Sequence, residues 1–241
     1  MRTVVISQPT YLPWTGYFRI MKEADVYVFL DNVQFEQRSW QSRNRIKSVE
    51  KFIWLSIPTH HNIQSMINEV EIDNSKSWNR QHLAAIKNSY GKAPYFKDYF
   101  PFFKSVYESE WTELVLLNIQ LIKYFASQLG ASPVFVRSSK LGLEGKRSSL
   151  LLDICKMFGA DRYVSSIGAK DYMETDGAQA IFENEGIKID FIEVKLFNYP
   201  QLFGEFIPDL SIIDFLFNCG PYSSKMLFDK DTAIFEGPNR E

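Results

Sequence analysis

The residues best suited to chemistry stand directly after two short apolar runs near the start of the chain. Gln8 follows residues 3–7, and Asp31 follows residues 25–30. If both runs are parallel strands, their carboxyl ends meet at the edge where open α/β sheets bind ligands. A carboxylate there can act as a general base, or bind a metal or a sugar hydroxyl. The alternative is a plain turn, because Asp and Asn are common turn residues.

Amide and aromatic side chains extend these two positions. Tyr11 and Trp14 follow Gln8, and Gln34 follows Asp31. We expect the two amides to bind substrate and the two rings to stack on a sugar or a base. The alternative for the rings is the core, because large aromatic side chains are usually buried.

Three cations alternate with other residues in the segment Arg43–Lys47. On an extended strand, Arg43, Arg45 and Lys47 lie on one face, while Asn44 and Ile46 lie on the other. Such a face suits a phosphate or a carboxylate, because Arg offers a bidentate fork and Lys a point charge. A nucleotide-linked or phosphorylated substrate is therefore expected. A solvated basic edge strand is equally consistent with this pattern.

Histidines and cysteines predict no metal site. Successive side chains on a strand point to opposite faces, so His60 and His61 are poor joint zinc ligands. The two cysteines, Cys155 and Cys219, lack the short spacing of a zinc site. His82 lies in a helical segment and is a candidate base, with a structural role as the alternative. No cofactor is identified.

Composition is that of an ordinary globular protein, with 45% apolar and 23% charged residues and a net charge of -2. The cations are not clustered, so we expect no nucleic-acid partner. No apolar stretch has membrane-spanning length, and the first residues lack the apolar core of a signal peptide. We therefore expect a cytoplasmic protein without a transmembrane segment. The pattern predicts no particular oligomeric state.

Apolar periodicity predicts an α/β fold, with a largely parallel sheet that opens with a βαβ unit and carries helices on its faces. The unit comprises strand 3–7, helix 14–23 and strand 25–30. Further strands are expected over 51–58, 134–137, 162–165 and 188–194. Further helices are expected over 78–90, 95–109, 112–129, 150–158, 177–185 and 210–217. We expect one domain over residues 1–241, with a mostly helical middle segment at about 77–130 and a loose tail over 229–241.

Longer stretches of the chain resemble the WbqC-like family. Residues 8–18, 31–35 and 43–47 look like its N-terminal signature, and the likeness continues through 54–58, 163–168 and 210–220. This family is associated with bacterial surface polysaccharide gene clusters, so the resemblance implies work on sugars or sugar-linked acyl groups. The positions that match are Gln8, Tyr11, Trp14, Asp31, Arg43, Asn44, Lys47, His82 and Asp214. Among the matching positions, we expect Asn44 and Asp214 also to bind substrate.

These observations lead to the hypothesis of a transferase that tailors a nucleotide-linked sugar or amino sugar by acyl or aminoacyl transfer. Asp31 or His82 would be the base, while Arg43 and Lys47 would hold a phosphate or carboxylate. Two alternatives remain. Residues 13–17 are similar in layout to the loop of nucleotidylyltransferases and pantothenate synthetase, without its histidines, which suggests an ATP-using enzyme. A non-catalytic partner in a polysaccharide assembly complex is the other.

Overall fold

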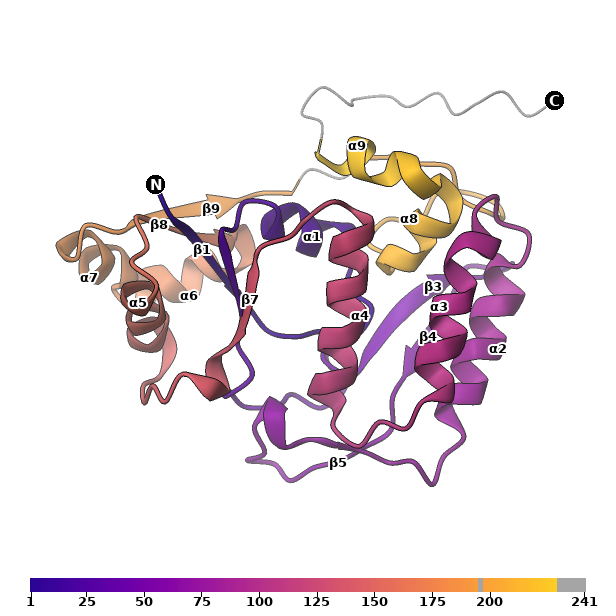
Figure 1. The fold of residues 1–241 in the computed structure, drawn as a ribbon, viewed down its shortest axis with the longest axis horizontal. Helices are drawn as coiled ribbons and strands as arrows, with labels where there is room; N and C mark the ends of the chain where they lie inside the picture. Colours follow the sequence, from indigo (N-terminus) through magenta and orange to yellow (C-terminus); the bar gives the residue numbers. More distant parts are fainter. Residues whose placement is uncertain (195–196, 229–241) are drawn as a thin grey trace. The chain divides into compact units, whose positions relative to one another are not determined.

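The computed structural model of the chain describes residues 1–194 and 197–228, which form two compact units (Figure 1). The first unit contains residues 1–9, 16–33 and 131–194, and the second contains residues 10–15, 34–130 and 197–228. The expectation of a single domain over residues 1–241 stays a prediction. The tail predicted over residues 229–241 lies outside the described residues.

Parallel strands form the sheet of the first unit and confirm the predicted α/β fold. They are β1 (Thr3–Ser7), β2 (Val26–Phe29), β7 (Val134–Arg137), β8 (Arg162–Ser166) and β9 (Lys188–Ile192), in the spatial order β7-β2-β1-β8-β9. Helix α1 (Thr15–Met21) joins β1 to β2. The chain therefore opens with the predicted βαβ unit.

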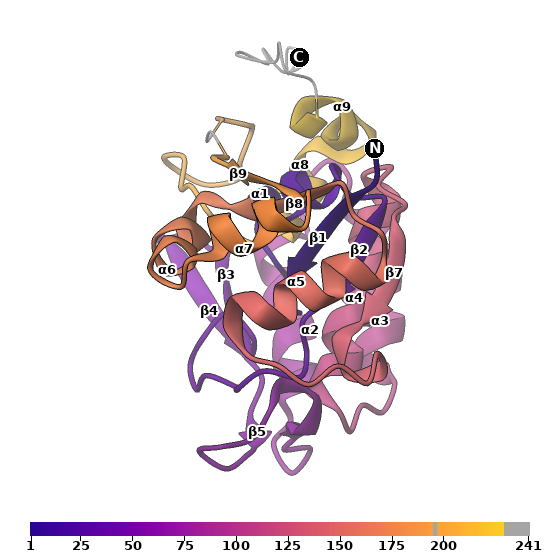
Figure 2. The same cartoon turned by 90° about the vertical axis from the view of Figure 1, so that its left-hand side faces the viewer.

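Both faces of this sheet are covered. Val4, Val28 and Tyr163 lie on one face, in a core shared with Ile154 of α5 (Arg147–Met157) and Phe182 of α7 (Ala178–Asn184). Figure 2 shows α5, α7 and the short helix α6 (Lys170–Thr175) in front of the strands. The opposite face is aromatic, with ring contacts among Tyr17, Tyr27, Phe29 and Phe135. Burial on both faces explains why these strands are continuous apolar runs and do not alternate with polar residues.

The order of the sheet creates a topological switch point beside β1. The chain continues from β1 to β2 and β7 on one side, and then forms β8 and β9 on the other side. Open α/β sheets bind ligands outside the carboxyl ends of the two strands at such a point. From the sequence we named the ends of the first two strands, and the observed order adds the end of β8, at Ser166, to this edge.

The second unit begins with an antiparallel hairpin of β3 (Arg43–Lys47) and β4 (Phe52–Ser56). The strand predicted over residues 51–58 therefore pairs with the basic segment and is not part of the parallel sheet. A further two-stranded sheet consists of β5 (Thr59–His60) and β6 (Glu71–Ile72). Because each of these strands has only two residues, no alternation in the sequence could reveal them.

Helices dominate the middle of the chain, as predicted. They are α2 (Trp78–Tyr90), α3 (Phe96–Glu108) and α4 (Leu114–Gln128), followed near the end of the described chain by α8 (Ile212–Cys219) and α9 (Ser223–Phe228). In α4, Leu114, Leu117, Leu121 and Phe125 recur every three or four residues and are fully buried, so this stripe forms the core of the second unit. Within residues 1–194 and 197–228, no helix has both the length and the apolar character needed to cross a bilayer.

Candidate functional site

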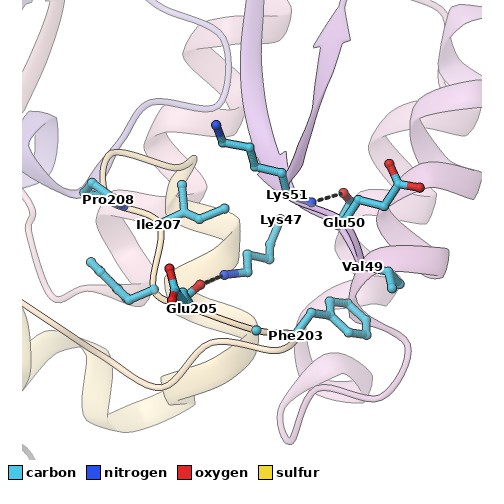
Figure 3. A pocket seen from close by; sticks show the side chains of 11 residues that line it. Lys47, Val49, Glu50, Lys51, Phe203, Glu205, Ile207 and Pro208 are labelled. Carbon is cyan, nitrogen blue, oxygen red and sulfur yellow. Dashed lines mark hydrogen bonds between the residues drawn. The ribbon is translucent and has the colours of Figure 1, made fainter.

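A pocket of about 520 Å³ opens in the second unit between the turn of the β3–β4 hairpin and the loop that precedes α8 (Figure 3). Residues 47–51 and 203–208 line it. Its volume lies within the range of small-molecule sites, roughly 300 to 1,000 Å³. Lys47, the last residue of β3, extends its ammonium group toward the backbone of Glu205 (Figure 3). The pocket therefore has a cation at its base.

Lys47 is a buried cation, only 2% exposed. Its Nζ donates to Oε1 of Gln201 across 3.1 Å and to the carbonyl oxygen of Glu205. Burial lowers the pKa of the Lys47 ammonium, while the Asp214 and Glu205 carboxylates raise it. Both hydrogen-bond acceptors are neutral, and no ion pair to Lys47 forms within the described residues. The dipoles of the Gln201 side-chain amide and the Glu205 backbone carbonyl therefore stabilise the positive charge of Lys47.

Behind Lys47 lies the buried carboxylate of Asp214, in the first turn of α8. Its Oδ1 accepts a hydrogen bond of 2.9 Å from Oη of Tyr90, and Tyr90 Oη accepts in turn from the backbone amide of Lys47 across 3.0 Å. Burial raises the pKa of Asp214 to about 6, against the lowering effects of Tyr199, Tyr90 and Lys47. A carboxyl group with this pKa changes its charge close to neutral pH.

We call Lys47, Tyr90, Tyr199, Gln201 and Asp214 the Lys47 cluster. The sequence predicted Lys47 and Asp214 as substrate-binding residues, and the structure brings these two together. It missed the two tyrosines and the glutamine, because residues of these types at these positions have no distinctive spacing. One sign was available for Asp214, a charged residue inside the apolar run of residues 210–217.

A group of rings and guanidinium groups covers the outer face of the β3–β4 hairpin, and we call Trp40, Arg43, Arg45, Phe52 and Trp54 the aromatic–arginine face. The Cζ atom of Arg43 lies 4.4 Å from the Trp54 ring centroid, and that of Arg45 lies 5.0 Å from the Phe52 centroid. Trp40 and Trp54 remain 48% and 42% exposed. The alternation predicted for this strand is consistent with these contacts, and aromatic rings stack on the two arginines.

Tyr11 and His82 meet in a buried hydrogen-bonded chain. Tyr11 Oη lies 2.8 Å from His82 Nδ1 and 2.5 Å from Tyr107 Oη. His82 Nε2 lies 3.2 Å from the carbonyl oxygen of Ser56, which can only accept, so Nε2 carries the proton and Nδ1 accepts from Tyr11. Burial lowers the pKa of His82 to about 4. His82 is therefore neutral at pH 7, and the lone pair on its Nδ1 atom accepts the hydrogen bond from Tyr11.

Asn44 fixes the loop that contains Tyr11. Its Nδ2 donates to the carbonyl oxygens of Tyr11 and Leu12, across 3.2 and 2.7 Å. Leu12 has a φ of 46°, a left-handed conformation that costs energy for a side chain with a Cβ atom. The loop also pairs with the start of α8, because Trp14 forms a bridge with Ser211. Much of the N-terminal signature thus holds residues 10–15 inside the second unit.

Gln34 lies on the surface of this unit. Its Nε2 donates to the carbonyl oxygen of Ile63 across 2.8 Å, and its backbone bridges to Met66. These contacts attach the exposed loop of residues 61–66. Its role in substrate binding stays a prediction.

The remaining predicted site residues, Gln8 and Asp31, belong to the first unit. Gln8 is half-buried, and its carbonyl oxygen accepts from Tyr17 Oη across 3.1 Å. Asp31 is fully buried and pairs with Nε of Arg137 at 2.6 Å. It also accepts from the Oγ of Ser138 and from the amide and Oγ of Ser139, across 2.8 to 3.1 Å. These bonds join the carboxyl ends of β2 and β7.

Metal-ligating side chains do not gather in the part of the chain that the structure describes: no group of three or more His, Cys, Asp and Glu residues there could hold an ion. The two cysteines are buried, and burial raises the pKa of the Cys155 thiol to about 12. Such a thiol is not ionised at neutral pH.

Sequence similarity relates this chain to known proteins. The model of the WbqC-like protein family matches residues 8–226. The uncharacterized protein Rv1507c of Mycobacterium tuberculosis is 31% identical over 224 residues, which cover 91% of this chain and 95% of that protein. No solved structure matches the chain.

Proposed function

This chain belongs to the WbqC-like protein family, and we propose that it is an enzyme of bacterial surface polysaccharide biosynthesis. It transfers an acyl or aminoacyl group to the amine of a nucleotide-linked amino sugar. The resemblance noted for the sequence supports the sugar substrate. The pocket at Lys47 supports a transfer reaction.

The observation that carries this proposal is an unused donor on Lys47. An ammonium group has three N–H donors. Within the described residues, Lys47 uses two of them, one to Gln201 and one to the carbonyl of Glu205. The third is available to an oxygen of the ligand. A desolvated cation binds an anionic oxygen more strongly than a solvated one does, because water screens it less.

Lys47 would act at the acyl carbonyl group. When the amine nitrogen of the sugar attacks the acyl carbon, negative charge develops on the carbonyl oxygen, and the free N–H of Lys47 stabilises it. The new C–N bond forms, the bond from carbon to the leaving group of the activated donor breaks, and the proton lost by nitrogen goes to the leaving group. Tyr90 and Asp214 are positioning residues for Lys47 in this proposal.

In this proposal, Asp31 and His82, which the sequence suggested as bases, position their hydrogen-bond partners and do not accept a proton. The Asp31 carboxylate already accepts from Arg137, Ser138 and Ser139. The Nδ1 lone pair of His82 already accepts from Tyr11. Neither group has a free site at which to accept a proton without losing a buried hydrogen bond.

Mass spectrometry of reactions that contain UDP- or dTDP-linked amino sugars and thioester or aminoacyl donors tests the function. We expect the mass of one sugar to increase by that of the acyl group. Lys47→Met should slow this reaction by a factor of about 100 or more, as loss of an oxyanion donor does. Lys47→Arg keeps the positive charge at this position, and Lys87→Ala, at an exposed lysine that does not line the pocket, is the matched control. A folded Lys47→Met protein with native activity would overturn the proposal.

One observation favours a second function, that of an ATP-using nucleotidyltransferase. The sheet order β7-β2-β1-β8-β9 places the loop after β1 at a switch point, as in doubly wound nucleotide-binding folds. This is fold-level analogy, which carries less weight than a site. Calorimetry with ATP and magnesium separates the two functions, because tight binding of ATP would favour the second.

A further inference from the structure

From the aromatic–arginine face we infer a binding site for a nucleoside diphosphate, in which the rings stack on the base and Arg43 and Arg45 hold the diphosphate. The inference rests on the proposed function in one respect, since it assigns a place to the nucleotide part of that substrate. The inference is based on the contacts of the β3–β4 hairpin and not on those of the Lys47 cluster.

Within the described residues, Arg43 and Arg45 lack a partner charge. Within residues 1–194 and 197–228, neither Arg43 nor Arg45 forms an ion pair with a carboxylate. Arg45 donates from Nη2 to the carbonyl oxygen of Asp209 across 3.3 Å, but its Nε atom is shielded from water and has no hydrogen-bond partner there. A shielded donor of this kind is costly unless an acceptor completes it. An anionic ligand at the guanidinium group would offset its uncompensated positive charge.

The second argument is the orientation that the rings impose. Arg43 stacks on Trp54 with its Cζ atom 4.4 Å from the ring centroid, and the Cζ atom of Arg45 lies 5.0 Å from the Phe52 centroid and 5.7 Å from that of Trp40. A guanidinium group that stacks by its flat face keeps its N–H edge free for a bidentate contact with phosphate. Stacking also fixes the side chain in advance, so less entropy is lost on binding.

The third argument is the exposed aromatic surface. Trp40 and Trp54 lie 5.6 Å apart, tilted by 33°, and each keeps close to half of its surface exposed. Rings that are held on one side and open on the other are platforms on which bases stack, with a contribution of about 1 to 3 kcal/mol per base.

The fourth argument is spacing along the strand. Residues two apart on a strand are about 7 Å apart, so Arg43, Arg45 and Lys47 mark about 13 Å on one face of β3. A nucleoside diphosphate sugar is an extended molecule with base, diphosphate and sugar in that order. With its diphosphate at Arg43 and Arg45, its sugar would lie one step further along β3, at the pocket that contains Lys47.

Isothermal titration with UDP, dTDP and inorganic pyrophosphate tests this site without any transfer reaction. We expect the double variant Arg43→Ala and Arg45→Ala to weaken all three ligands at least tenfold, and the double lysine variant to weaken them less. Trp54→Leu should weaken UDP and dTDP more than pyrophosphate, because the base loses its stacking ring while pyrophosphate loses only the ring that orients Arg43. The matched control replaces two exposed lysines of the same unit, Lys87→Ala and Lys92→Ala.

Several outcomes would overturn the inference. Native affinity for UDP in a folded double alanine variant would do so, as would failure of the native protein to bind any of the three ligands at millimolar concentration. Binding of phosphatidylglycerol vesicles through the same arginines, without competition from UDP, would identify the face as a membrane contact. UDP binding without acyl transfer to any amino sugar would leave this inference standing and reject the proposed function.

Discussion

Tyr90 Oη lies 2.9 Å from Asp214 Oδ1 and accepts the amide hydrogen of Lys47 across 3.0 Å. One hydroxyl group therefore joins the last residue of α2, the first turn of α8 and the end of β3. Burial and the neighbouring Asp214 raise the pKa of the Tyr90 hydroxyl well above its ordinary value. Tyr90 thus remains protonated and keeps donating to the carboxylate.

Replacing Tyr90 with Phe should reduce the free energy of unfolding by about 1 to 3 kcal/mol, because Asp214 Oδ1 and the Lys47 amide would each lose a buried partner. Urea denaturation measures this loss. The control is Tyr172→Phe, at a tyrosine that is 45% exposed, for which we expect little change. Equal stability of the two variants would contradict the role given to Tyr90.

Asp214 should make the protein less stable as the pH rises. Its pKa in the folded chain is about 6, above the ordinary value of 3.8, so the folded state binds its proton more tightly than the unfolded state. The stabilisation is fully present below about pH 4 and is lost as the pH rises through 6. The full shift corresponds to a contribution on the order of 3 kcal/mol.

Asp214→Asn removes this titration. Between pH 4 and pH 7, the stability of the variant should therefore increase relative to that of the native protein. Urea denaturation at several pH values, at constant ionic strength, gives the difference. A difference between the two proteins that does not vary with pH would show that Asp214 keeps an ordinary pKa.

His82 should have the opposite dependence on pH. Its pKa in the folded chain is about 4, below the ordinary 6.5, so the folded state binds this proton less tightly. The stabilisation is present above pH 6.5 and is lost as the pH falls toward 4, on the order of 3 kcal/mol in all. His82→Gln keeps a donor and an acceptor, and should lose less stability than the native protein between pH 7 and pH 4.

The activity of His82→Gln distinguishes a positioning role from that of a base. As a positioning residue, His82 should tolerate Gln with a modest loss of rate and an unchanged pH profile of kcat. Disappearance of the acidic limb of that profile would instead restore His82 as the base.

Asp31→Asn should destabilise the first unit by about 3 kcal/mol, because it removes the buried charged partner of the half-buried Arg137 guanidinium. Chemical denaturation followed by circular dichroism measures the loss, and Glu144→Gln, at an exposed carboxylate, is the control. Native stability with abolished activity would favour the catalytic role predicted from the sequence.

The sequence predicted the fold well where apolar periodicity is long. Helix 78–90 and strand 134–137 have the predicted limits, because burial of a whole face or run leaves a clear pattern. The short helices α6 and α9, with six residues each, were not predicted. Fewer than two helical turns give no recognisable period.

The candidate site could be predicted only in part. Lys47 was identified from the alternating cations of residues 43–47 and Asp214 from the resemblance to the WbqC-like family, but their partners Tyr199 and Gln201 come from a loop without any periodic pattern. Tyr11, Asn44 and His82 were expected to contact substrate, and the structure shows them bonded to one another and to the backbone. A single sequence does not distinguish a polar side chain that meets a ligand from one that satisfies a buried loop.

Each unit is assembled from three separate stretches of the chain. Any single break between residues 10 and 195 therefore leaves both units without part of their sequence. Any stretch of chain that contains the whole of one unit also contains large parts of the other, so shortening the gene from one end cannot give either unit alone. A truncation that ends within these limits should consequently abolish the whole protein at once and not leave a surviving half.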